Sequence, residues 1–120
     1  DKAIELKIPE GVEKIEHFSS CEKLQTIYFP STLKSLDSLT FYSIDVVGFG
    51  TVTESSKVPQ LTTIYISKET KIEKNCFAKC STLSDVYFNG NIADWAISKA
   101  SDISGSTTIT IHCNDGDLII

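Results

Sequence analysis

Apolar and polar residues alternate along this chain in a seven-residue phrase that occurs several times. Its clearest copies are LQTIYFP from Leu24, LTTIYIS from Leu61 and LSDVYFN from Leu83, each with tyrosine in the fifth place. In every copy two apolar residues stand two positions apart. Because successive side chains of a strand point to opposite sides, this spacing predicts a short β-strand with one face buried.

Three looser copies extend the pattern: AIELKIP from Ala3, IDVVGFG from Ile44 and STTITIH from Ser106. The copies recur about every 20 residues, a spacing typical of repeat proteins whose units bury their apolar faces against one another. We therefore predict a mainly β fold with short helical turns, a leucine-rich-repeat-like right-handed solenoid of about six coils with a parallel sheet along one face. The residues expected to line its interior are Leu6, Ile8, Ile27, Phe29, Val47, Phe49, Ile64, Ile66, Val86, Phe88, Ile109 and Ile111.

A second motif stands between the predicted strands. Phe18, Phe41 and Phe77 each begin an expected tight turn, and in two cases a cysteine follows three residues later, at Cys21 and Cys80. A small thiol packs as an apolar filler in such a bend. After the third phrase the segment GTVTESSKVPQ replaces this turn, and we expect an irregular excursion there.

The residue between the two buried positions of each strand must point outward. One outward column is expected to contain Lys7, Tyr28, Gly48, Tyr65, Tyr87 and Thr110, and its neighbour Glu5, Thr26, Val46, Thr63, Asp85 and Thr108. In this arrangement Gly48 leaves a notch between Tyr28 and Tyr65. Tyrosine is enriched at interfaces, but tyrosine and threonine also occupy exposed strands simply because they favour strands. The candidate binding face is Tyr28, Tyr65, Tyr87, Thr26, Thr63 and Asp85.

The repeat L-x-x-I-x-I-P-x-x-V-x-x-I, followed by F-x-x-C-x-x-L, resembles the BspA-like leucine-rich repeat, also called the Treponema-type repeat. The closing stretches VYFNGNIADWAISKA and TITIHCNDG resemble the ending common in that family. The resemblance covers almost the whole chain, with Ser67 in place of the usual proline. It implies a surface protein of bacteria or protozoa, often involved in adhesion, and hence an extracellular or cell-surface location.

Length and composition predict one domain over residues 1–120, because 120 residues with 41% hydrophobic residues suffice for one core. The repeats are expected over about 3–105 and a C-terminal capping element over about 89–120. In that element Asn91 is the expected N-cap of a short helix on which Trp95 closes the end of the solenoid. The chain begins at Asp1 and has no methionine, so we expect a piece of a longer precursor.

The charge excludes two classes of partner. The net charge is −5, and the 11 basic residues are all lysines, scattered singly. Nucleic acids and anionic membranes are bound by clustered basic residues, so neither is expected. No apolar run is long enough for membrane insertion. The module is expected to be monomeric.

The sequence offers little for catalysis, metal binding or a cofactor. The two histidines, His17 and His112, have no nucleophile motif nearby, so turn or strand-end roles are favoured. Cys76 and Cys80 lack the paired partners of a zinc site, and buried free thiols are favoured. We expect all four cysteines to be reduced, no metal, no cofactor and no enzyme activity.

Three functions fit these observations. The first is a non-enzymatic interaction module of a secreted or surface protein that binds a protein or a glycan. The second is a structural spacer that displays another domain. The third is a substrate-recognition domain attached to a surface enzyme such as a cell-wall hydrolase.

Overall fold

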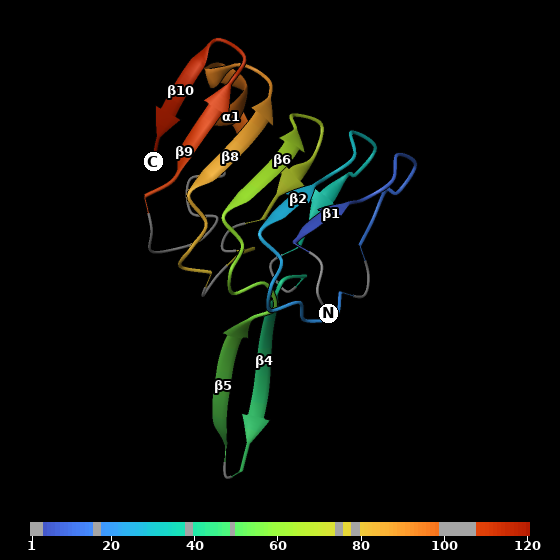
Figure 1. Cartoon of the computed structure of the whole chain (residues 1–120), viewed down its shortest axis with the longest axis vertical. Coiled ribbons are helices and arrows are strands. Elements are labelled where there is room, and N and C mark those ends of the chain that lie inside the picture. The colour runs from blue at the N-terminus through green and yellow to red at the C-terminus, as the bar shows by residue number, and fades with distance from the viewer. Residues whose placement is uncertain are drawn as a thin grey trace.

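The structure is a computed structural model that describes residues 4–15, 18–37, 40–48, 50–73, 76–77, 80–98 and 108–120. It is mainly β, with one short helix, α1 (Ile92–Ser98), in the described part. A six-stranded sheet runs along one side of the molecule in the order β1-β2-β6-β8-β9-β10 (Figure 1). Its strands are β1 (Glu5–Lys7), β2 (Thr26–Tyr28), β6 (Thr63–Ser67), β8 (Asp85–Asn89), β9 (Thr110–Cys113) and β10 (Gly116–Ile119).

The repeated phrases set the register of this sheet. Neighbouring strands from β1 to β9 are parallel. From β1 to β8, like positions of the phrases stand opposite each other, as Ile27 does to Ile64 and Ile64 to Val86. The sixth strand, β10, is antiparallel to β9. The prediction of six parallel strands, one from each phrase, was therefore wrong in two respects: the third phrase is missing from the sheet, and the last strand lies beyond the sixth phrase.

The third phrase lies in a β-hairpin instead. β4 (Tyr42–Val47) and β5 (Thr51–Ser56) pair only with each other and project from the body of the molecule (Figure 1). The expected irregular excursion is thus a regular antiparallel ribbon. Gly48 and Gly50 have positive φ angles of 46° and 82°, which suit a tight hairpin turn. The Lys57 amide donates to the Phe41 carbonyl at 2.8 Å and closes the base of the hairpin.

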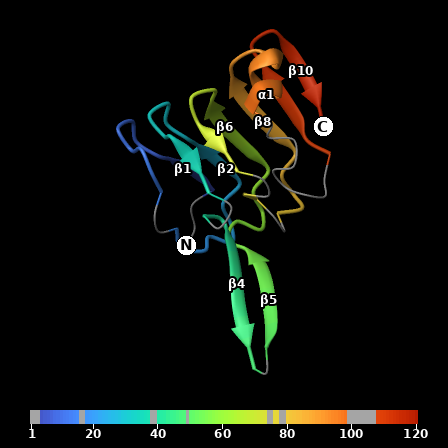
Figure 2. The same cartoon turned by 180° about the vertical axis from the view of Figure 1, so that it is seen from behind.

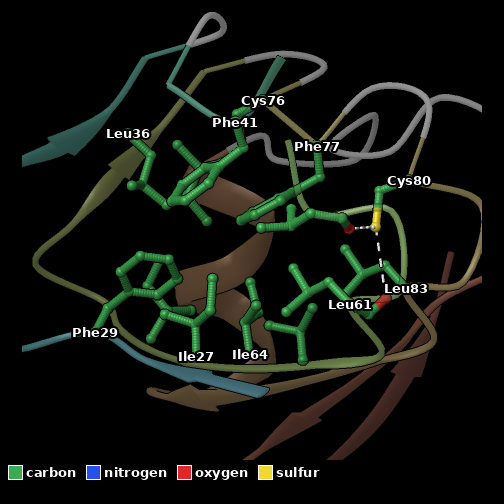
Figure 3. Close-up of a cluster of buried hydrophobic side chains, with 14 of the residues drawn as sticks. Ile27, Phe29, Leu36, Phe41, Leu61, Ile64, Cys76, Phe77, Cys80 and Leu83 are labelled. Carbon is green, nitrogen blue, oxygen red and sulfur yellow. Dashed lines mark hydrogen bonds between the residues drawn. The ribbon is translucent and has the colours of Figure 1, made fainter. Parts of the chain in front are cut away.

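A second layer faces the sheet across the core. It contains the two-stranded sheet of β3 (Ser35–Leu36) and β7 (Lys71–Ile72), which lies in front of the large sheet in the reverse view (Figure 2). The Phe41 and Phe77 rings stack in the core with centroids 4.9 Å apart, and Phe29 meets Phe41 edge to face. In the close-up Phe41 and Phe77 lie opposite Ile27 and Ile64 of the sheet strands (Figure 3). Phe29 lies beside Ile27, on the sheet side of the core.

The predicted interior agrees with the observed core where it can be compared. The buried members are Ile27, Phe29, Ile64, Ile66, Val86, Phe88, Ile109 and Ile111. Leu6 and Ile8 pack half-buried against the same core. Val47 and Phe49 lie outside the described side chains.

The expected helix follows β8. The Asp94 carboxylate accepts a hydrogen bond at 2.9 Å from the amide of Asn91, the helix N-cap, in a capping-box relation. Trp95 is buried and meets Phe88 edge to face at 5.1 Å. Trp95 therefore packs in the core near the C-terminal end, as the sequence predicted.

Candidate functional site

Four rings form a continuous ladder on the outward face of the large sheet. Tyr28, Tyr65, Tyr87 and His112 come from the adjacent strands β2, β6, β8 and β9. Their centroids are 4.4, 4.7 and 4.4 Å apart, and neighbouring planes are tilted by no more than 15°. The spacing approaches that between paired strands, so the backbone register itself stacks the rings. We call these four residues the aromatic ladder.

The sequence predicted three members of the ladder and missed the fourth. Gly48 belongs to the hairpin, so Tyr28 and Tyr65 are direct neighbours and the predicted notch is absent. His112 stands opposite Tyr87, where Thr110 was expected, because β9 pairs two residues further along than the phrase suggested. Thr110 instead stands opposite Asp85 in the second column.

The second outward column runs beside the ladder. It contains Glu5, Thr26, Thr63, Asp85 and Thr110, from β1, β2, β6, β8 and β9 in that order. All six residues of the candidate binding face therefore lie together on one side of the sheet. Val46, expected in this column, lies in the hairpin with 75% of its surface exposed.

Because the rings of the aromatic ladder stack face to face, the ladder presents ring edges and tyrosine hydroxyls to solvent. Tyr65 is covered by a ring on each side, and the outer face of Tyr28 carries the Lys7 ammonium 5.2 Å from its centroid. Desolvation, the Glu5 charge and the neighbouring Tyr65 raise the pKa of Tyr28, which keeps its hydroxyl protonated. Tyr87 is the most exposed of the tyrosines in the ladder, at 40%.

At the other end, two carboxylates hold the imidazole of His112. Its Nε2 lies 2.8 Å from Asp85 and its Nδ1 lies 3.1 Å from Asp117 of β10. The hydrogen bond with Asp85, followed by the interactions with Asp117, raises the pKa of His112 despite partial desolvation. Hydrogen bonds from His112 and Ser84 lower the pKa of Asp85.

A shallow open hollow of about 450 Å³ lies beside the ladder, at the carboxyl ends of the parallel strands. Tyr65, Tyr87 and His112 contribute to one side. Two positions further along the chain from these three are Ser67, Asn89 and Asn114, which also line it. The Asn114 side-chain amide donates to the Asn89 side-chain oxygen at 3.3 Å. The hollow thus combines aromatic edges with amide and hydroxyl groups.

The sequence analysis noted Ser67 in place of the usual proline but assigned none of these three polar residues to the binding face. Each lies two residues after an outward aromatic residue, at the end of its strand. The first two phrases carry proline at this place. The replacement of that proline by serine and asparagine was the available signal, since proline lacks the backbone donor and has no polar side chain.

The site shows no arrangement suited to catalysis. Both nitrogens of His112 already contact carboxylates. Cys113, which lines the hollow, has a raised pKa because of desolvation and nearby Asp115, so its thiol is not activated as a nucleophile. No metal-binding group of three or more His, Cys, Asp or Glu residues occurs within the described part of the chain. Cys21, Cys76, Cys80 and Cys113 are all free of disulfides.

Repeated strands stacked in register, with an outward aromatic face and a buried aliphatic face, define a repeat protein. A family model described as "BspA type Leucine rich repeat region" matches residues 2–114 in six copies. The chain belongs to this BspA-type leucine-rich repeat family. Neither curated proteins nor solved structures give a match. Over the described residues, no helix is long and apolar enough to cross a membrane.

Proposed function

We propose that this chain is a non-enzymatic interaction module that binds a protein partner across the aromatic ladder and the adjoining hollow. In this proposal its repeats wind as a right-handed solenoid and form one domain over residues 1–120. The observation that carries the proposal is the ladder itself. Three tyrosines and a histidine stack in one row beside polar side chains.

The geometry favours a protein over a glycan. Tyr65 and Tyr87 have rings stacked on both faces, so these faces cannot also stack on a sugar ring. What remains is a row of ring edges and hydroxyls beside the amides of Asn89 and Asn114. Tyrosine supplies a large apolar area with a polar tip at protein interfaces. Glycan binding stays the alternative, through hydrogen bonds to the hydroxyl and amide groups.

The experiment is a binding screen against immobilised matrix proteins and glycan arrays, followed by variants on any hit. The double variant Tyr65→Ala/Tyr87→Ala removes the centre of the ladder, and a hot-spot tyrosine costs more than about 1 kcal/mol of binding when truncated. We expect at least about a fivefold loss of affinity from the pair. Unchanged binding, with circular dichroism showing an intact fold, would place the interaction elsewhere.

Two further variants sharpen the result. Tyr42→Ala truncates a tyrosine in β4 of the hairpin, outside the ladder, and is the matched control that should leave binding unchanged. Tyr65→Phe/Tyr87→Phe keeps the stack but removes two hydroxyls. Loss of binding in this pair assigns recognition to hydroxyl hydrogen bonds, and retained binding assigns it to ring contacts.

The family membership supports a secreted or cell-surface location and a role in adhesion to host or microbial partners, and we include both in the proposal. The ladder favours a binding role over a structural spacer, because a spacer needs no such row of aligned rings. A substrate-recognition domain beside an enzyme such as a cell-wall hydrolase would use the same face, and a catalytic domain in the same polypeptide would identify it.

A further inference from the structure

His112 occupies an unusual position at one end of the aromatic ladder. A neutral imidazole has one N–H and one lone pair, so it donates only one hydrogen bond. Here both ring nitrogens face carboxylate oxygens, at 2.8 Å for Asp85 and 3.1 Å for Asp117. Carboxylates above their pKa only accept hydrogen bonds. Both contacts are therefore satisfied together only by the imidazolium form, in which both nitrogens carry a proton.

The same ring stacks on Tyr87, with centroids 4.4 Å apart and planes tilted by 15°. A cation over a tyrosine face is attracted by the negative face of the ring. At the opposite end the Lys7 ammonium lies over Tyr28. The three tyrosines are thus held between two cations, of which only the histidine titrates near neutral pH.

We infer that His112 is a proton-dependent clamp: as imidazolium it bridges β8 and β10 and fixes the end of the ladder, and its deprotonation releases that end. This regulation of the binding face rests on the proposed function, whereas the protonation of His112 and its effect on the ladder do not.

The side chains that contact His112 all favour its protonated form. From β8 it meets Asp85 and Tyr87, and from β10 it meets Asp117. Ser84 donates to Asp85 at 2.8 Å and keeps that carboxylate in place. In the described part of the chain, no lysine forms an ion pair with either carboxylate. Loss of the proton therefore leaves one of the two carboxylates facing an imidazole lone pair in place of an N–H. It also leaves one positive charge fewer beside the hollow.

The test is an NMR titration of the whole chain without any ligand, following the His112 ring and the Tyr87 ring protons as a function of pH. His112 is distinguished from His17, the other histidine, by the variant His17→Gln. We expect the His112 pKa to lie above its ordinary value, and the Tyr87 resonances to shift with the same midpoint. The Tyr28 resonances at the far end should shift less.

Two variants show whether the Tyr87 shift is caused by protonation of His112 or by another group that titrates in the same pH range. Asp117→Asn removes one charge from a side chain that is 61% exposed, so the fold should be preserved, and the shared midpoint should move to lower pH. His112→Gln should abolish the pH-dependent shift of Tyr87. The inference is overturned if His112 titrates at or below its ordinary value, or if Tyr87 does not respond at the His112 midpoint. Neither outcome bears on whether the Tyr65→Ala/Tyr87→Ala pair loses binding.

Discussion

Individual contacts explain why some positions tolerate only one residue. Gly90 follows β8 and is buried. A Cβ placed there would lie 2.7 Å from Cε2 of Phe88 and 3.1 Å from Cβ of Lys68. The Phe88 ring cannot move freely, because it packs edge to face on Trp95. The small size of this residue is thus a packing requirement of the core.

Gly90→Ala is therefore expected to lower the free energy of unfolding by about 1–3 kcal/mol, the usual cost of overpacking. Urea denaturation of the variant measures this loss. Gly90→Ala/Phe88→Leu is the matched test, since the smaller side chain removes the clash. The second change should cost less in the Gly90→Ala background than alone, and strict additivity would argue against the steric explanation.

The charges around His112 predict a pH range of greatest stability. A raised His112 pKa stabilises the fold fully below the ordinary histidine pKa of about 6.5, and this contribution is lost as the pH rises through the raised value. The lowered Asp85 pKa stabilises above the ordinary value of about 3.9 and is lost as the pH falls through the lowered value. Both contributions are complete between about pH 4 and pH 6.5.

We expect the difference in unfolding free energy between the unmodified chain and His112→Gln to be largest in that range and to shrink on either side. Urea denaturation at a series of pH values gives the difference directly, and subtraction cancels groups that both proteins share. A difference that does not change with pH would mean that the contacts of His112 contribute nothing through their charges.

At the scale of elements, the hairpin β4–β5 stands apart from the rest. On one face Ile44, Val46 and Val52 are at least 51% exposed, and its two strands pair only with each other. Its anchors, by contrast, are fully buried: Phe41 before it and Val58 after it lie in the core. We therefore expect the stability of the fold to depend on the buried residues at the base of the hairpin and not on the length of its strands.

Replacement of residues 43–55 by Asn-Gly, between the paired residues Tyr42 and Ser56, should leave the body folded. The unfolding free energy should change by less than about 1 kcal/mol, as for exposed sites generally. Phe41→Ala is the contrasting variant and should cost about 3–5 kcal/mol through the cavity that it creates. Thermal unfolding followed by circular dichroism compares the two, and comparable losses would show that the hairpin supports the core.

On the scale of the whole molecule, one cluster of buried residues extends from Cys21 to Ile111. Phe41, Phe77 and the aliphatic side chains of four sheet strands share it, and Trp95 belongs to it near the C-terminal end. Repeat proteins can unfold unit by unit when only neighbours interact. A shared core that links distant repeats favours a single transition instead.

Trp95 fluorescence and far-UV circular dichroism should therefore give coincident urea transitions. Trp95 is the only tryptophan, so its fluorescence reports on the C-terminal end alone, whereas the dichroism reports on the entire chain. A fluorescence transition that comes clearly before the dichroism change would mean that this end unfolds as a separate unit, and that residues 1–120 are not one cooperative domain.

The sequence alone determined the repeat, the two faces of its strands and most of the core. The phrases around Ile27, Ile64 and Val86 share one pattern of apolar and outward positions, so their strands align in register and bury the same positions. That periodicity also placed Tyr28, Tyr65 and Tyr87 in one outward column, because alternation in a strand is a local property of the backbone.

The tertiary structure decided which phrases join the sheet. IDVVGFG fits the seven-letter pattern, but together with TVTES it also reads as two alternating strands around Gly48 and Gly50, the pattern of a hairpin. The alternation of apolar and polar residues is the same in a sheet strand and in a hairpin strand. Which of the two forms depends on which other strands are available as pairing partners in the folded chain. For the same reason the sequence missed His112, whose place beside Tyr87 depends on the pairing of β9 with β8 and on a carboxylate supplied by β10.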